Sequence, residues 1–116
     1  MYIVVNSDLK LSVGQIAAQV SHVTHLIVDE IIRTGYESYP VPESYIKYMN
    51  WCKNNITIVK KATEVQLLEL SKMESARYFY DDIYSKKTQY KNNCLTIVGF
   101  LPLSINADML FEYDLL

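Results

Sequence analysis

The chain has 116 residues, of which 50% are hydrophobic and 21% are charged, and its formal net charge is -2. This length suits one domain with one hydrophobic core, and this balance excludes disordered and fibrous proteins. Domains that bind nucleic acids are usually clearly basic, so the overall charge does not by itself indicate such a partner.

Two cysteines, Cys52 and Cys94, are far apart in the sequence and show neither CxxC nor Cys/His ligand spacing. We expect them to be reduced thiols, which is typical of a cytoplasmic protein. The apolar run at residues 2–5 follows no charged segment and is far too short for a signal peptide or a membrane span. The sequence therefore predicts a cytoplasmic location without membrane contact.

The N-terminal third predicts a strand and a long amphipathic helix. Residues 2–6 form a β-branched run suited to a buried strand, and a short polar loop follows them. Ser12 is a good N-cap residue, and Gly35 suits the end of a helix. Between them, apolar side chains recur near the helical period, at Val13, Ile16, Ala17, Val20, Val23, Ile27, Val28 and Ile31.

The middle of the chain predicts two further helices with a strand between them. Residues 36–42 contain two prolines and are expected to form a loop, after which residues 43–52 predict a short helix. The β-branched run at residues 56–59 predicts a strand. Thr63 is expected to cap a helix that continues to Met73.

The last third predicts two strands, with the polar, lysine-rich residues 81–93 as a loop between them. The first strand is expected at residues 76–80, and the second, fully buried, at residues 95–101 before Pro102. A last short helix is expected from about Ser104. The order βααβαββα predicts a single-domain α/β fold in three layers, α/β/α, with a mixed sheet of roughly four strands.

Two stretches of the sequence carry a resemblance to a known family. Residues 4–22, VVNSDLKLSVGQIAAQVSH, keep a motif made of Asp8, Leu9, Lys10, Gly14, Ala17, Ala18, Gln19 and His22. Residues 88–102, TQYKNNCLTIVGFLP, keep Thr88, Gln89, Thr96, Gly99 and Pro102 without a gap. In these motifs and in its predicted element order, the chain resembles the type-2 peptidyl-tRNA hydrolases, the archaeal and eukaryotic class, over residues 1–116.

The resemblance implies hydrolysis of the ester that joins a stalled peptide to the terminal ribose of tRNA, without a metal or an organic cofactor. Such a site needs an activated water and hydrogen-bond donors for the developing oxyanion. Members of the family use a lysine before the AAQ motif, an aspartate ahead of the lysine-rich loop and two threonines. In this chain the lysine position holds Gln15 and the aspartate position holds Tyr84. The candidate catalytic residues are Gln15, His22, Asp82 as a substitute aspartate, Thr88 and Thr96.

The candidates on the first helix share one stripe, because Gln15, Gln19 and His22 are separated by four and then three residues. Spacing alone favours a solvated surface for this stripe, whereas the resemblance makes Gln15 and His22 active-site candidates. His22 and His25 lack a third ligand at suitable spacing, so no metal site is expected. Hydroxyls such as that of Thr96 often only satisfy backbone groups near a strand end.

Four lysines, Lys10, Lys86, Lys87 and Lys91, are candidates for phosphate contacts with tRNA. Such side chains are most often a solvated face, and the resemblance favours contact with the acceptor stem. Contacts of this kind carry no base identity. The sequence leaves open whether the protein forms a homodimer.

An aromatic stretch contains Tyr36, Tyr39, Tyr45, Tyr48 and Trp51. These side chains could stack unpaired bases, but such a set more often forms a small cluster under a loop, which is the expectation here.

The expected function is therefore peptidyl-tRNA hydrolysis. The alternative is a member of the same fold that has lost hydrolysis and serves as a tRNA-binding or protein-interaction module, because both charged catalytic positions have changed. An unrelated small-molecule enzyme has no support, since the sequence has no P-loop, dinucleotide fingerprint or nucleophile elbow.

Overall fold

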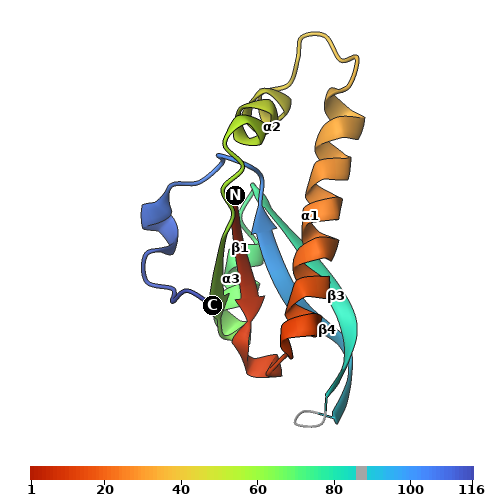
Figure 1. The fold of residues 1–116 in the computed structure, drawn as a ribbon, viewed down its shortest axis with the longest axis vertical. Helices are drawn as coiled ribbons and strands as arrows, with labels where there is room; N and C mark the ends of the chain where they lie inside the picture. Colours follow the sequence, from red (N-terminus) through yellow and green to blue (C-terminus); the bar gives the residue numbers. More distant parts are fainter. Residues whose placement is uncertain (86–88) are drawn as a thin grey trace.

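In the computed structural model, which describes residues 1–85 and 89–116, helices cover both faces of a four-stranded mixed sheet (Figure 1). The three-layer α/β/α fold expected from the sequence is confirmed, except that the last helix is a short 3-10 turn, η2. The elements are β1 (Tyr2–Asn6), η1 (Ser7–Leu9), α1 (Val13–Gly35), α2 (Glu43–Lys53), β2 (Ile58–Ala62), α3 (Glu64–Ser71), β3 (Ala76–Ser85), β4 (Gln89–Phe100) and η2 (Ala107–Leu110).

The strands lie in the order β2-β1-β4-β3. β1 runs parallel to β2 and antiparallel to β4, and β3 and β4 form an antiparallel hairpin. The parallel pair is expected, because a helical crossover separates β1 from β2 in the chain. β1 and β4 are the central strands and contain the most continuous apolar runs of the sequence.

The sheet separates two hydrophobic clusters. Ile3 and Val5 of β1 face α1, whose buried Val23 and Ile27 pack against them, whereas Val4 faces the cluster under α3. This alternation follows from the two-residue period of a strand. Both clusters are covered by helices, so β1 and residues 94–100 of β4 are buried on both faces of the sheet.

The starts of α1 and α3 confirm the predicted caps. Ser12 and Gln15 form a capping box, in which each side chain accepts a hydrogen bond from the other residue's backbone N–H. Thr63 and Gln66 form a second one. Each box satisfies two backbone donors that the first helical turn leaves unpaired, which fixes where the helix begins.

The prediction of a loop at residues 81–93 is wrong, because both hairpin strands extend into it as far as Ser85 and Gln89. Two irregularities in the pairing of β3 with β4 accommodate the polar sequence. Ile83 is buried within this segment and packs with Leu9 and Cys94. The hairpin therefore has a small apolar cluster of its own near its turn, although this part of the sequence predicts a loop.

The aromatic stretch divides into two groups. Tyr45, Tyr48 and Trp51 are half-buried and pack against the cluster under α1, as expected for a structural cluster. Tyr36 and Tyr39 are 66% and 96% exposed, so the expectation is wrong for these two.

The helix α1 ends where the sequence predicts, at Gly35, but without the left-handed turn that glycine usually forms there, and the need for glycine comes from a close approach. A Cβ atom at Gly35 would overlap the ring of Tyr45 on α2 and lie 2.8 Å from its Cβ. The absence of a side chain at Gly35 therefore lets α2 pack on the end of α1 (Figure 1).

The C-terminal segment covers one edge of the sheet. Leu115 bridges to Lys60 of β2, and Leu116 donates its backbone N–H to the Val59 carbonyl. Lys60 in turn donates to the carbonyls of Leu110 and Tyr113. The edge formed by β2 is therefore protected from pairing with another chain.

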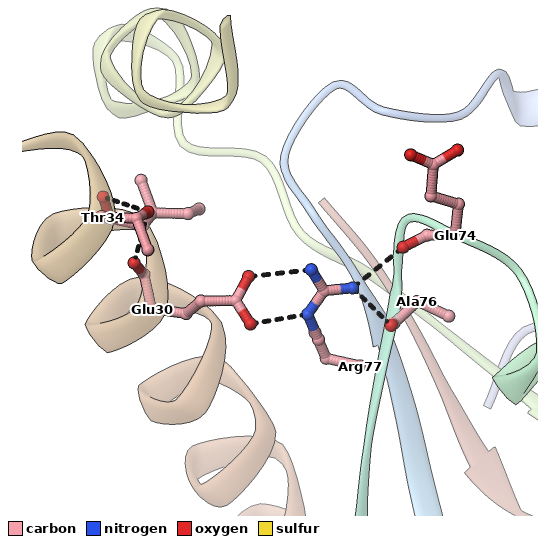
Figure 2. Close-up of polar contacts among 6 residues, drawn as sticks. Glu30, Thr34, Glu74, Ala76 and Arg77 are labelled. Atoms are coloured by element: carbon pink, nitrogen blue, oxygen red, sulfur yellow. Dashed lines mark hydrogen bonds and ion pairs between the residues drawn. The ribbon is translucent and has the colours of Figure 1, made fainter. Parts of the chain in front are cut away.

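An ion pair ties α1 to the start of β3 (Figure 2). Nε and Nη2 of Arg77 donate to the two carboxylate oxygens of Glu30 at 2.8 Å, and Nη1 donates to the carbonyls of Glu74 and Ala76. A planar guanidinium suits this two-pronged contact.

Within the described residues, no helix is both long and apolar enough to span a membrane.

Candidate active site

The polar stripe of α1 is only partly solvated, because Gln19 is buried and Gln15 is half-buried while His22 is exposed, which corrects the expectation from its spacing in part. It follows β3 in antiparallel direction, and each of its three side chains contacts that strand: Gln15 at Tyr84, Gln19 at Asp81 and His22 at Phe79. Glu30, two turns further on, contacts Arg77. The stripe therefore forms the seam between helix and sheet edge.

Gln19 is the centre of a hydrogen-bond network that joins three elements. It is 3% exposed, its Nε2 lies 2.9 Å from Oδ2 of Asp81, and its Oε1 lies 2.6 Å from Oγ1 of Thr96. The Thr96 hydroxyl is fully buried and also lies 3.1 Å from the Phe79 carbonyl. The network links α1 to β3 and β4 through the buried side chains of Gln19 and Thr96.

The Asp81 carboxylate fixes the direction of this network. An ionised carboxylate accepts hydrogen bonds only, so the amide NH₂ of Gln19 must face Asp81 and its oxygen must face Thr96. The single hydroxyl proton of Thr96 is then shared between Gln19 and the Phe79 carbonyl. Thr96 thus orients Gln19, and Gln19 holds one oxygen of Asp81 at the seam.

Gln15 has two structural contacts. Its Oε1 belongs to the capping box of α1, and its Nε2 donates to the Tyr84 carbonyl at 2.7 Å. One amide proton remains for a further acceptor. Gln15 and Tyr84, where the resemblance leads us to expect a lysine and an aspartate, are therefore neighbours although 69 residues separate them. An amide and an exposed phenol stand where a charged pair is expected.

His22 is exposed and stacks on Phe79, with ring centroids 4.8 Å apart and an angle of 24° between the rings. Both residues line an open groove of about 690 Å³ that continues along α1 past Leu26 and Glu30 to Thr34. The groove also contains His25, but no three His, Cys, Asp or Glu side chains of the described residues are grouped to hold a metal ion.

Asp82 lies away from the stripe, in the exposed part of the hairpin. Its Oδ1 accepts the backbone N–H of Asn93 at 2.8 Å, and its Oδ2 accepts the Tyr90 hydroxyl at 3.1 Å. The hydrogen bond to this carboxylate raises the pKa of the Tyr90 phenol. Asp82 therefore fastens the two hairpin strands together, and the carboxylate that reaches α1 is that of Asp81.

The two lysine candidates that the structure describes, Lys10 and Lys91, lie near the turn end of the hairpin. Lys10 follows η1, whose Leu9 packs on Ile83, and Lys91 pairs with Ile83 across the hairpin. Both lysines are exposed. The remaining candidates, Lys86, Lys87 and Thr88, lie outside the described residues.

Sequence reasoning missed Asp81 and did not single out Gln19 for a role. Both lie at positions that the patterns contained: Gln19 is in the AAQ motif, and Asp81 continues the alternation of Arg77 and Phe79, which face α1. Ending the predicted strand at Tyr80 hid this alternation. A longer strand would have assigned Asp81 to the helix-facing side.

Comparison with known proteins agrees with this geometry. Residues 1–107 match the family model described as Peptidyl-tRNA hydrolase PTH2. A search of curated proteins finds no significant match to the chain. The matched region contains α1, the whole sheet and every contact of the seam described above, so the chain belongs to the PTH2 peptidyl-tRNA hydrolase family.

Proposed function

We propose that this protein hydrolyses the ester bond of peptidyl-tRNA, or of an N-blocked aminoacyl-tRNA, and releases free tRNA and peptide. The observation that carries the proposal is the seam between α1 and β3, where Gln15, Gln19 and His22, from the segment that holds the family motif, contact β3. Membership in the family supplies the reaction class.

The reaction requires a base for the attacking water. His22 is exposed and lines the groove, and histidine is the side chain most often used as a general base. The seam also contains the Asp81 carboxylate. Its Oδ2 accepts from Gln19 and its Oδ1 accepts from the Asp82 backbone N–H, so each oxygen keeps a lone pair for a further hydrogen bond. We assign water activation to His22, with Asp81 orienting the water.

The reaction also requires donors for the oxyanion that forms on the ester carbonyl. The second amide proton of Gln15 supplies one neutral donor, and the hydroxyl of Thr88 is assigned as another. Thr96 is a positioning residue in this scheme, because its hydroxyl is buried and acts through Gln19. Asp82 supports the site indirectly by holding the hairpin.

Recognition of tRNA is assigned to four lysines, Lys10, Lys86, Lys87 and Lys91. Lys10 and Lys91 are exposed beside the end of the seam that holds Gln15, so a phosphate bound there would bring the ester close to the site. These contacts would weaken with salt and would not select a sequence.

A second candidate function is a tRNA-binding or protein-interaction module without hydrolysis. The neutral pair Gln15 and Tyr84 favours it, because neither side chain supplies the charge that the family uses at these positions.

The experiment is the release of N-acetylalanine from N-acetylalanyl-tRNA by the purified protein. We expect measurable hydrolysis, with His22→Ala and Asp81→Asn each lowering kcat by roughly 10²-fold or more. Asp108→Asn, an exposed change in η2 far from the seam, is the matched control and should leave the rate unchanged. A wild-type chain that binds the tRNA and releases nothing would establish the binding module instead.

A further inference from the structure

The groove between α1 and β3 is longer than the catalytic site requires. From His22 to Thr34, one side of the groove follows α1 for three turns, about 18 Å at 1.5 Å per residue. A water and an ester carbonyl need only the end beside His22. The length of the groove corresponds to roughly five residues of an extended peptide.

The strand beside this groove is a free sheet edge. β3 lies at the end of the strand order, and no strand of the described residues pairs with its outer side, whereas the C-terminal segment covers β2 at the opposite edge. The Phe79 carbonyl faces β4, where it meets the Thr96 hydroxyl. Since successive residues of a strand direct their backbone groups to opposite sides, Tyr78 presents its N–H and C=O outward.

We propose that this groove binds the peptide moiety of peptidyl-tRNA as an extended strand added to the edge of β3. The inference rests on the proposed function, which provides a substrate with a peptide attached to the reacting ester. Hydrogen bonds to the β3 backbone would hold the peptide through its own backbone. Such binding tolerates many sequences, as a hydrolase of varied peptides requires.

The direction of the bound peptide follows from the direction of the elements. The ester is the C-terminal end of the peptide and must lie beside His22, so the peptide extends from there toward Thr34 in the C-to-N direction. β3 begins near Glu30, to which Arg77 is bound (Figure 2), and it ends near Gln15, which donates to the Tyr84 carbonyl. The peptide therefore runs parallel to β3.

The strand geometry also sets where the peptide leaves the edge. Regular pairing of β3 with β4 continues from Ala76 to Phe79, and a register shift follows between Phe79 and Tyr80. The shift places the extra residue, Thr96, in β4, and a bulge of this kind increases the local twist of the strand pair. The peptide would pair with the regular part and turn away at Phe79, beside His22, which is where its ester must enter the site.

The test is direct binding of N-acetyl-pentaalanine amide, followed by amide chemical shifts and hydrogen exchange, with N-acetylalanine amide as the short control. We expect the longer peptide to bind at least fivefold more tightly and to protect the Tyr78 amide. Leu26→Trp should fill the groove and weaken binding at least fivefold. Ile32→Trp is the matched control, because Ile32 is similarly exposed on α1, 41% against 37%, but does not line the groove.

A second pair of variants tests the backbone contact itself. Tyr78→Pro removes the outward N–H, whereas Tyr78→Ala removes the side chain and keeps the N–H. The proline variant should lose binding and the alanine variant should retain it. Equal binding by all variants, or pairing of β3 with a second copy of the chain in sedimentation and exchange experiments, would overturn the proposal. Because these readouts do not depend on hydrolysis, a chain that binds the peptide but is inactive would contradict only the proposed function.

Discussion

Gln19 and Asp81 are 62 residues apart in the sequence, and a 2.9 Å hydrogen bond joins Nε2 of the first to Oδ2 of the second. This bond connects a motif in the first helix to the edge strand of the sheet. Since Gln19 also accepts from the buried Thr96, the edge strand is held to α1 by polar contacts as well as by the Glu30–Arg77 ion pair (Figure 2).

Removing the amide of Gln19 should destabilise the protein. Gln19→Leu leaves the Asp81 carboxylate and the Thr96 hydroxyl each with one partner fewer, which typically costs about 1 to 3 kcal/mol of unfolding free energy. Urea denaturation measures this loss. Thr96→Val should cost a similar amount, and the double variant should cost less than the sum, because the two changes remove the same bond. Strictly additive losses would contradict a coupled network.

Rebuilding the charged pair should accelerate hydrolysis. Gln15 and Tyr84 are already in contact, so Gln15→Lys with Tyr84→Asp would restore a lysine and an aspartate at adjacent positions. One well-placed donor to an oxyanion is worth about 3 to 4 kcal/mol, and the neutral amide recovers part of that, so we expect at least a tenfold increase in kcat. Single-turnover release of N-acetylalanine measures it. A lower rate would mean that the native amide is the better donor.

The two ion pairs of α1 should differ in their contribution to stability. Arg77→Lys loses the two-pronged bond to Glu30 and the contacts with two carbonyls, in a half-buried position, and should cost about 1 to 3 kcal/mol. Arg33→Lys disturbs the exposed pair with Asp29 and should lower the free energy of unfolding far less than Arg77→Lys does, because solvent screens an exposed pair. Urea midpoints at constant slope compare them, and equal effects would refute this ranking.

The three glycines should respond differently to alanine. At Gly99 a Cβ would lie 2.8 Å from Cδ1 of Ile27, and at Gly35 it would overlap Tyr45, so each change should cost about 1 to 3 kcal/mol. Gly14 has no atom within 4 Å of such a Cβ, and Gly14→Ala should stabilise the protein by about 0.4 to 1 kcal/mol. Thermal unfolding of the three variants is the measurement, and Gly14→Ala serves as the control.

The two thiols should differ in reactivity. Cys52 is exposed, whereas Cys94 is buried and its burial raises the pKa of its thiol, so less thiolate is present at a given pH. A thiol reagent at about pH 8 should therefore modify one cysteine rapidly in the native protein and two in urea. The Cys52→Ser variant should lose the fast phase, and a fast phase that persists in it would show that the Cys94 thiol is accessible.

The sequence by itself determined the helix starts and the central strands. Ser12 and Thr63 predict the caps of α1 and α3 because a capping box depends on residues three apart. β1 and the apolar part of β4 follow from continuous β-branched runs. The family motif also lies in one local stretch, so the reaction class could be inferred before the fold was known.

Only the tertiary structure decided which polar residues meet. The hairpin reads as a loop because its pairing depends on partners across the turn and on Ile83 packing against Leu9, neither of which is a local property. The assignment of Asp81 to the seam, and of Asp82 to the hairpin, depends on which face of β3 each side chain occupies. Alternation from Arg77 and Phe79 puts Asp81 on the face toward α1 only if the strand continues past Tyr80, and that continuation depends on pairing with β4, which local sequence does not determine.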